Sequence, residues 1–274
     1  MGENIMKLLM LGTGNALVTE CYNTCFILSE EGKNFLVDTG GGNTILHHIK
    51  HAGFSLPEIH DVFISHSHID HILGAIWVIR ISAQLMNKGR FDGDLNIYSH
   101  DEVIELTDEI CRKFLLPYQY DYVHKRIHLI TVSKNETRNI IGHDVKFFDV
   151  NSPRTKQFGF IMDYDFSKNG KKLAFCGDEP CHESSYDYVM GCEWLMHESF
   201  CLYSEANIFD PYEKHHSTVK DACITAQKLG VKNLLLYHTE DSDLAHRKER
   251  YTAEGRKYFG GNIFIPDDME ILTL

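Results

Sequence analysis

The stretch His66-Ser67-His68-Ile69-Asp70-His71 places three histidines and one aspartate within six residues. It directly follows Val62-Phe63-Ile64, an apolar run that predicts a buried strand. Imidazoles and carboxylates bind transition metals at about 2.0–2.2 Å when a fixed backbone makes them converge. A short loop leaving a buried strand meets this requirement, and two neighbouring sets of ligands are what a two-metal hydrolytic centre needs. We therefore predict a metal site here; the alternative is a histidine-rich surface loop.

Bulk composition narrows the class of protein. A length of 274 residues allows one large or two small domains, and 43% hydrophobic residues can form a sizeable core. Because there is no apolar run of about 18 residues, we expect no membrane span, and the N-terminal stretch lacks the features of a secretory signal. The eight cysteines form no CxxC pair, which favours free thiols and a cytoplasmic location over a disulfide framework.

The charge balance limits the partners. The net charge is −12, from 39 acidic and 27 basic residues. Non-specific nucleic-acid binding depends on Lys and Arg neutralising phosphates, so an acidic surface argues against an extended nucleic-acid interface. A small nucleotide substrate stays compatible with this charge.

The chain alternates short apolar runs with helical segments and contains no low-complexity linker. We predict one α/β domain over residues 1–274, formed by two β-rich halves with helices on the outer side of each. Strand-end loops of both halves are expected at one edge, where ligands bind in layered α/β folds. Helices are predicted over Thr44–His51, Ile72–Met86, Asp101–Leu115 with Asp101 as N-cap, Thr218–Leu229 with Ser217 as N-cap, and Leu244–Phe259.

Two further strand ends carry residues of the metal-binding type. Asp178 follows the predicted strand Lys172–Cys176, and His238 follows Leu234–Tyr237. Each signal is weak alone, because Asp178 also suits a Gly-Asp turn and His238 a satisfied core position. Taken with His66–His71, both stand where a further ligand is needed.

These segments together resemble the metallo-β-lactamase superfamily, and within it the ribonuclease Z-like branch. The resemblance runs over nearly the whole chain and implies the αββα four-layer sandwich as a single domain. The segments that carry it are Leu11-Gly12-Thr13-Gly14-Asn15, Asp38-Thr39-Gly40, His66–His71, Gly177-Asp178, Leu195-Met196-His197-Glu198, His216-Ser217-Thr218 and Leu236-Tyr237-His238.

The resemblance also implies a role for each site residue. It assigns His66 and His68 to a first divalent metal, and Asp178 to a bridge between two metals. The second metal falls to Asp70, His71 and His238. Zinc is the expected metal, with manganese or iron as alternatives. A metal-bridging hydroxide would be the nucleophile, which Asp70 could orient or deprotonate.

The resemblance further implies a proton donor. Glu198 and His216 match the pair that helps to protonate the leaving oxygen in this branch, a step that an alkoxide leaving group requires. The alternative for His216 is a solvated helix start. Arg250-Tyr251 resembles an Arg-Tyr pair after the last ligand, so Arg250 is a candidate phosphate contact; a solvated helix face is the alternative.

One ligand of the branch is missing from this chain. Asn151 stands where a third histidine of the first metal is expected, and an amide oxygen binds zinc less well than an imidazole does. His143 and His182 are the nearest substitutes in sequence, with His182 better placed. We expect the first site to be weakened, with a preference for one metal or for a harder metal such as manganese.

A second departure concerns the substrate. The tRNA-processing members carry a protruding arm between the aromatic-Gly-aromatic strand and the bridging aspartate. Here Ile161 to Phe175 leaves room only for a hairpin around Asn169-Gly170. We expect Gln84–Ile127 and Phe200–Lys214 to act as lids instead. Aromatic residues of the latter could line a small pocket or simply pack in the core: Phe200, Tyr203, Phe209 and Tyr212.

The leading hypothesis is a metal-dependent phosphodiesterase acting on a small nucleotide or an RNA end. The alternatives are a tRNA 3′ processing endoribonuclease, a thioester or lactone hydrolase, and a degenerate metal-binding member without activity. A homodimer is compatible with the branch, although no segment of the chain indicates an interface.

Overall fold

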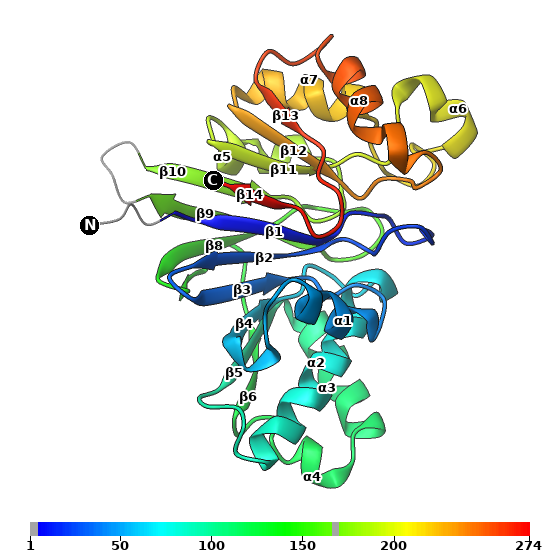
Figure 1. Ribbon diagram of the computed structural model, residues 1–274. Helices are drawn as coiled ribbons and strands as arrows, with labels where there is room; N and C mark the ends of the chain where they lie inside the picture. The colour runs from blue at the N-terminus through cyan, green and yellow to red at the C-terminus, as the bar shows by residue number, and fades with distance from the viewer. Residues whose placement is uncertain (1–4, 166–169) are drawn as a thin grey trace. The chain divides into compact units, whose positions relative to one another are not determined.

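The computed structural model describes residues 5–165 and 170–274. These residues group into two compact units (Figure 1). Unit 1 consists of Met1–Gly12, Asn23–Ser133 and Asp268–Leu274, and unit 2 of Thr13–Tyr22 and Lys134–Asp267. That residues 1–274 form a single domain stays a prediction.

Unit 1 contains, within the described residues, a seven-stranded sheet in the order β14-β1-β2-β3-β4-β5-β6. Strands β3 to β6 run parallel to one another. The chain therefore needs a crossover connection, usually a helix, both before and after β4. Its strands are β1 (Lys7–Gly12), β2 (Cys25–Glu30), β3 (Lys33–Val37), β4 (Ile59–Phe63), β5 (Leu95–Ser99), β6 (Ile127–Thr131) and β14 (Ile271–Thr273). Its helices are α1 (Thr44–His51), α2 (Ile69–Asn87), α3 (Asp101–Phe114) and α4 (Pro117–Tyr120), with a 3-10 turn at Leu56–Glu58.

Unit 2 repeats the arrangement with the order β13-β12-β11-β10-β9-β8-β7 over the part of the chain that is described. Strands β10 to β13 are parallel, and β7, β8 and β9 are antiparallel. The strands are β7 (Thr137–Ile140), β8 (His143–Asp149), β9 (Phe158–Asp165), β10 (Lys171–Phe175), β11 (Trp194–Glu198), β12 (Asn233–Tyr237) and β13 (Asn262–Phe264). The helices are α5 (Tyr186–Val189), α6 (Ala206–Phe209), α7 (Val219–Leu229) and α8 (Leu244–Gly255), with 3-10 turns at Glu183–Ser185 and Tyr203–Glu205.

The core of unit 2 lies between its sheet and the two long helices α7 and α8. Ala222, Ala226 and Tyr251 from these helices belong to the same buried apolar cluster as Leu234 and Leu236 of β12. Because β12 is buried along its whole length, it reads as a continuous apolar run, which is typical of a central parallel strand. The carboxyl end of this strand is the point at which His238 leaves the sheet.

The predicted helices and central strands are present, but two predicted N-caps are wrong by one residue. Asp101 is the first residue of α3, and His100 occupies the N-cap position of that helix. In α7 the N-cap is Thr218, whose side chain accepts from the Asp221 N–H, so Ser217 lies one residue before the cap. In both cases a neighbouring polar residue holds the extended backbone that a cap requires. The N–H and the hydroxyl of Ser217 donate hydrogen bonds to the side chain and the carbonyl of Glu198 instead.

Three edge or near-edge strands, β6, β7 and β13, were not predicted from the sequence. Strand β7 exposes Thr137, Arg138 and Asn139, and Ile140 alone is buried. Edge strands carry polar side chains that discourage pairing with other chains, which removes the apolar alternation that predicts a strand. The predicted hairpin around Asn169-Gly170 falls partly outside the described residues, between the end of β9 and the start of β10.

Helix α2 is long and apolar enough to cross a membrane by length and composition, and 56% of its apolar window is buried inside the protein. The core helix of a soluble protein passes the same test, so this helix is weak evidence for a membrane span.

Candidate metal centre and proton donor

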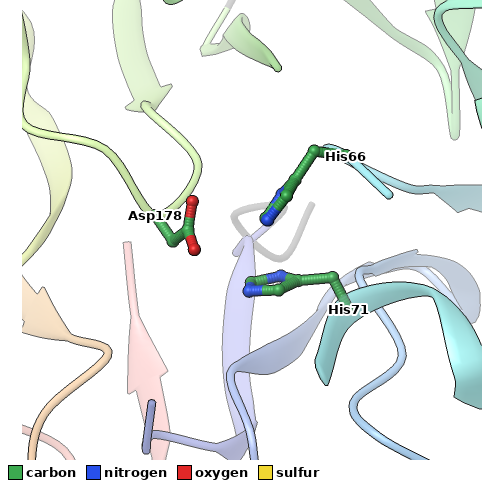
Figure 2. Close-up of side chains that lie close together, drawn as sticks. All are labelled: His66, His71 and Asp178. Carbon is green, nitrogen blue, oxygen red and sulfur yellow. The ribbon is translucent and has the colours of Figure 1, made fainter. Parts of the chain in front are cut away.

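The predicted ligand loop connects β4 to α2 in unit 1. His66 is fully buried in the loop, while His68 caps α2 and is exposed, and Asp70 and His71 occupy the first helical turn. The ring of His66 lies 4.5 Å from that of His68 and 4.2 Å from that of His71, centroid to centroid. Figure 2 shows the rings of His66 and His71 side by side with their nitrogen-bearing ends pointing the same way. The structure therefore brings the histidines of the loop together.

A buried carboxylate that the sequence analysis placed in a motif, but gave no role, orients these rings. Asp38 has a positive φ of 53° after β3, and its side chain accepts from the Ser65 N–H (2.7 Å) and the Ser65 hydroxyl (2.8 Å). His71 donates from Nδ1 to Asp38 (2.8 Å). Since the Ser65 hydroxyl donates to Asp38, its oxygen accepts from Nδ1 of His66 (2.9 Å). Both histidines are thus held in the tautomer that presents Nε2 as the metal ligand.

The electrostatics of His71 follow from the same carboxylates. Burial alone would lower its pKa, but the negative charges of Asp70 and Asp38 outweigh burial and hold the pKa of His71 well above its ordinary value. The Asp70 carboxylate lies 3.3 Å from Nε2 of His71. Two carboxylates around one buried imidazole form a site that attracts a cation.

In unit 2, Asp178 lies in the turn after β10 and is also drawn in Figure 2. Gln157, a residue that sequence reasoning missed, fixes this turn with both ends of its amide. Its Nε2 donates to Asp178 Oδ1, and its carbonyl oxygen accepts from the Asp178 N–H (3.0 Å). Gly177 has a φ of +68°, and a Cβ there would lie 2.2 Å from the Gln157 carbonyl oxygen, so glycine is required.

His238 leaves the buried end of β12 with a φ of +59° and is 2% exposed. Its Nε2 lies 3.6 Å from Asp178 Oδ2. Ligand atoms of Asp178, His216 and His238 all lie within 4.8 Å of one another, which is close enough for a shared cation. Two of the predicted ligands and the predicted proton donor therefore meet in unit 2.

The predicted proton donor is held by its predicted partner. Nδ1 of His216 lies 3.4 Å from Glu198 Oε2, and Glu198 Oε1 accepts from the Ser217 N–H (2.6 Å). Phe200 stacks on the His216 ring at 5.1 Å with an interplanar angle of 15°, and Lys214 lies 4.7 Å over the Phe200 ring. Phe200 is thus a packing partner of His216 rather than an exposed pocket wall. Burial would lower the pKa of His216, yet Glu198 and more distant carboxylates raise it above its ordinary value.

The other candidates of the sequence analysis have different surroundings. Asn151 is exposed with a φ of +56°, and its N–H and Nδ2 turn back to Asp149. His143 begins β8, at the end away from Asn151, and bonds the Asp163 carbonyl (3.1 Å). The Arg250 guanidinium is paired with Asp243 (3.1 Å) and Glu205.

The donor set fits a divalent transition metal. Buried imidazoles with an Nδ1 hydrogen bond to a carboxylate or hydroxyl, next to further carboxylates, are the arrangement by which proteins hold zinc and similar ions. The clusters of candidate ligands among the described residues contain only His and Asp, and all eight cysteines are free thiols.

Comparisons with known proteins find chains of similar structure and sequence. YhfI of Bacillus subtilis, a metallo-β-lactamase fold protein, superposes with a TM-score of 0.79 at 16% identity, covering 99% of this chain and all of that one. The short form of human tRNase Z gives a TM-score of 0.73 at 18% identity, covering 97% and 98%. Ribonuclease Z of Thermococcus onnurineus is 25% identical over 318 aligned positions, covering 98% of this chain and 95% of the relative.

The fold is that of metallo-β-lactamase fold proteins such as YhfI, and the sequence is similar to ribonuclease Z, in agreement with the resemblance predicted from the sequence. More narrowly, the family model of the anti-Pycsar protein Apyc1 matches residues 6–255, and the chain belongs to this family.

Proposed function

We propose that this protein is a metal-dependent phosphodiesterase that acts on a small nucleotide. His66, His68, Asp70 and His71 would bind divalent ions together with Asp178 and His238, and zinc is the expected metal. Family membership and the ring orientation of His66 and His71 support this ligand set. Bound ions would supply Lewis-acid charge that neutralises the phosphate and lowers the pKa of a water nucleophile.

The observation that carries the proposal is the Glu198–His216 pair next to Asp178 and His238. Hydrolysis of a phosphodiester expels an alkoxide from phosphorus, and an alkoxide is a poor leaving group until it is protonated. Glu198 lies against Nδ1 of His216 and raises the pKa of its ring above the ordinary value, which favours the protonated form that a proton donor needs. Phe200 on one ring face and Glu198 on Nδ1 fix the direction in which Nε2 can deliver it.

A small substrate is favoured over a folded RNA by charge and by length. The net charge of −12 disfavours long contacts with a phosphate backbone. The alignment with the archaeal ribonuclease Z extends over 318 positions against 274 residues here, so the relative contains segments without a counterpart in this chain. The alternative is a tRNA 3′ endoribonuclease, which is supported by the similarity to ribonuclease Z of Thermococcus onnurineus and to the short form of human tRNase Z.

Thioester hydrolysis gives the proton donor less purpose, because it expels a thiolate that needs little protonation. A lactone expels an alkoxide, so the assays on phosphodiesters, rather than the proton donor, distinguish a lactone hydrolase. A metal-binding member without activity would have no reason to keep His216 stacked and paired. We also propose a cytoplasmic location, which the eight free thiols support.

The test combines metal content with turnover. The purified chain is assayed for metal ions and for hydrolysis of bis(p-nitrophenyl) phosphate, a dinucleotide, a cyclic nucleotide and a precursor tRNA. We expect bound metal and turnover of the small diesters, reduced about 100-fold or more in His216→Asn. Cleavage of the precursor tRNA alone would favour the endoribonuclease. A chain that holds metal and hydrolyses no phosphodiester would reject an enzymatic role of this kind.

A further inference from the structure

Helix α1 of unit 1 carries two exposed histidines, His47 and His51, which are four positions apart. Residues at this spacing lie on the same face of a helix, one turn after the other. The buried residues of α1 are Ile45 and Ile49, and each precedes one of the histidines by two positions. Two positions correspond to about 200° around a helix. The apolar face therefore fixes α1 to unit 1 and leaves both imidazoles on the solvent face.

The two imidazole rings lie against each other. Their centroids are 3.8 Å apart, with an interplanar angle of 28°. Nδ1 of His51 lies 3.0 Å from the His47 carbonyl oxygen, and because a carbonyl can only accept, this nitrogen carries the proton. In the neutral ring the lone pair of His51 is then on Nε2. This is the tautomer of a metal ligand whose other ring nitrogen donates to a carbonyl.

The surroundings keep this pair available to a metal ion. Partial desolvation lowers the pKa of His47, and the positive charges of the neighbouring imidazoles and of Lys50 lower it further. An imidazole binds metal only in its neutral form, which a lowered pKa favours. His51 is the last residue of α1, where the partial negative charge of a helix C-terminus stabilises a cation.

We propose that His47 and His51 form a further metal site on the surface of unit 1, which binds a divalent transition-metal ion such as Ni²⁺, Cu²⁺ or Zn²⁺. Two histidines at positions i and i+4 on one helix face are the pair of nitrogen ligands that helical zinc motifs use. Because both protein ligands are nitrogen, the site should bind Cu²⁺ and Ni²⁺ better than Mn²⁺. Neither residue belongs to the ligand clusters of the candidate metal centre, so the proposal does not depend on the proposed function.

The experiment titrates the protein with Ni²⁺ by calorimetry and by equilibrium dialysis with elemental analysis. The variants are His47→Gln, His51→Gln and the double variant, and the difference from the parent removes ions bound elsewhere in the chain. His246→Gln is the matched control: His246 is 66% exposed and also lies on a helix, but Ser242 and Arg250 stand four positions from it. Circular dichroism and unfolding midpoints establish that each variant is folded.

We expect each single variant to bind one Ni²⁺ ion fewer per chain than the parent, and the double variant to lose no more than either single variant. Such non-additivity is the signature of one ion held by two ligands, whereas two independent histidines would give additive losses. Mn²⁺ binding should be the same in the parent and in these variants. His246→Gln should bind Ni²⁺ as the parent does.

Parental Ni²⁺ binding in both single variants, additive losses in the double variant, or an equal loss in His246→Gln would overturn the proposal. Failure of the proposed function gives a different result. A chain that hydrolyses no phosphodiester, and still loses one Ni²⁺ ion in His47→Gln and in His51→Gln, rejects the phosphodiesterase and supports the surface site.

Discussion

Asp38 connects two histidines that are proposed as metal ligands, His66 and His71, through hydrogen bonds. Its carboxylate accepts from Nδ1 of His71 directly and reaches His66 through the hydroxyl of Ser65. One buried residue thereby sets the tautomer of both rings, and such partners are commonly as important for metal affinity as the ligands.

Replacing Asp38 by asparagine should weaken metal binding about 10- to 100-fold. The amide of Asn can still accept from the Ser65 N–H, but an NH₂ group facing Nδ1 of His71 forces the proton to the other ring nitrogen. A competition titration with a chromophoric chelator measures the change. Asp61→Asn is the control, because Asp61 bonds Asn96 and Tyr98 on the same sheet. Parental affinity in Asp38→Asn would contradict the role given to this residue.

The pH dependence of turnover should report on His216. In the proposed mechanism the protonated form of His216 donates the proton, and its pKa is raised above the ordinary value, so activity should fall as the pH rises through the raised pKa. Glu198→Gln removes the negative charge that raises this pKa but keeps an oxygen for the Ser217 N–H. The alkaline limb of the kcat profile should then move to lower pH. An unmoved limb in Glu198→Gln would assign that limb to another group.

At the scale of the elements, helix α2 is hydrogen-bonded to the turn after β3 that carries Asp38. The Gly74 N–H donates to the Gly40 carbonyl (3.0 Å), and the Thr39 hydroxyl donates to the His71 carbonyl (2.6 Å). The first turns of α2 and the end of β3 are therefore one hydrogen-bonded assembly, which carries Asp70 and His71.

Gly74→Ala should destabilise the protein by about 1–3 kcal/mol, as overpacking of a close contact does. A Cβ at this position would lie 2.0 Å from the Thr39 carbonyl oxygen, so the helix has to move away from the turn. Urea unfolding measures the loss. Gly42→Ala is the matched control, since nothing lies within 4 Å of a Cβ there. Equal urea unfolding midpoints for the two variants would show that the turn can move away from the added Cβ without loss of stability.

At the level of the molecule, the proposed metal ions should contribute to the stability of the fold. Because metal binds the folded chain, its removal should lower stability; saturation at 100 times the dissociation constant corresponds to about 2.7 kcal/mol. Stripping the protein with a chelator should lower the unfolding temperature, and adding Zn²⁺ or Mn²⁺ back should restore it. An unfolding midpoint that does not depend on metal would contradict the proposed metal binding.

The sequence by itself determined the superfamily, the fold class and the residues offered as metal ligands. It could do so because His66–His71 concentrates the ligands in a local segment, and apolar runs such as that before His238 mark central strands. The spacing of residues along one short loop is a local property, and local properties can be read without a structure.

The tertiary structure decided which distant side chains hold the site in place. Gln157 on Asp178 and Phe200 on His216 are pairs separated by about 15 to 20 positions, and no local pattern relates them. The same holds for edge strands such as β7, whose partners rather than their apolar content make them strands. Contacts of this kind arise when the sheet brings separate strand ends to the same place, so they become visible only in the folded chain.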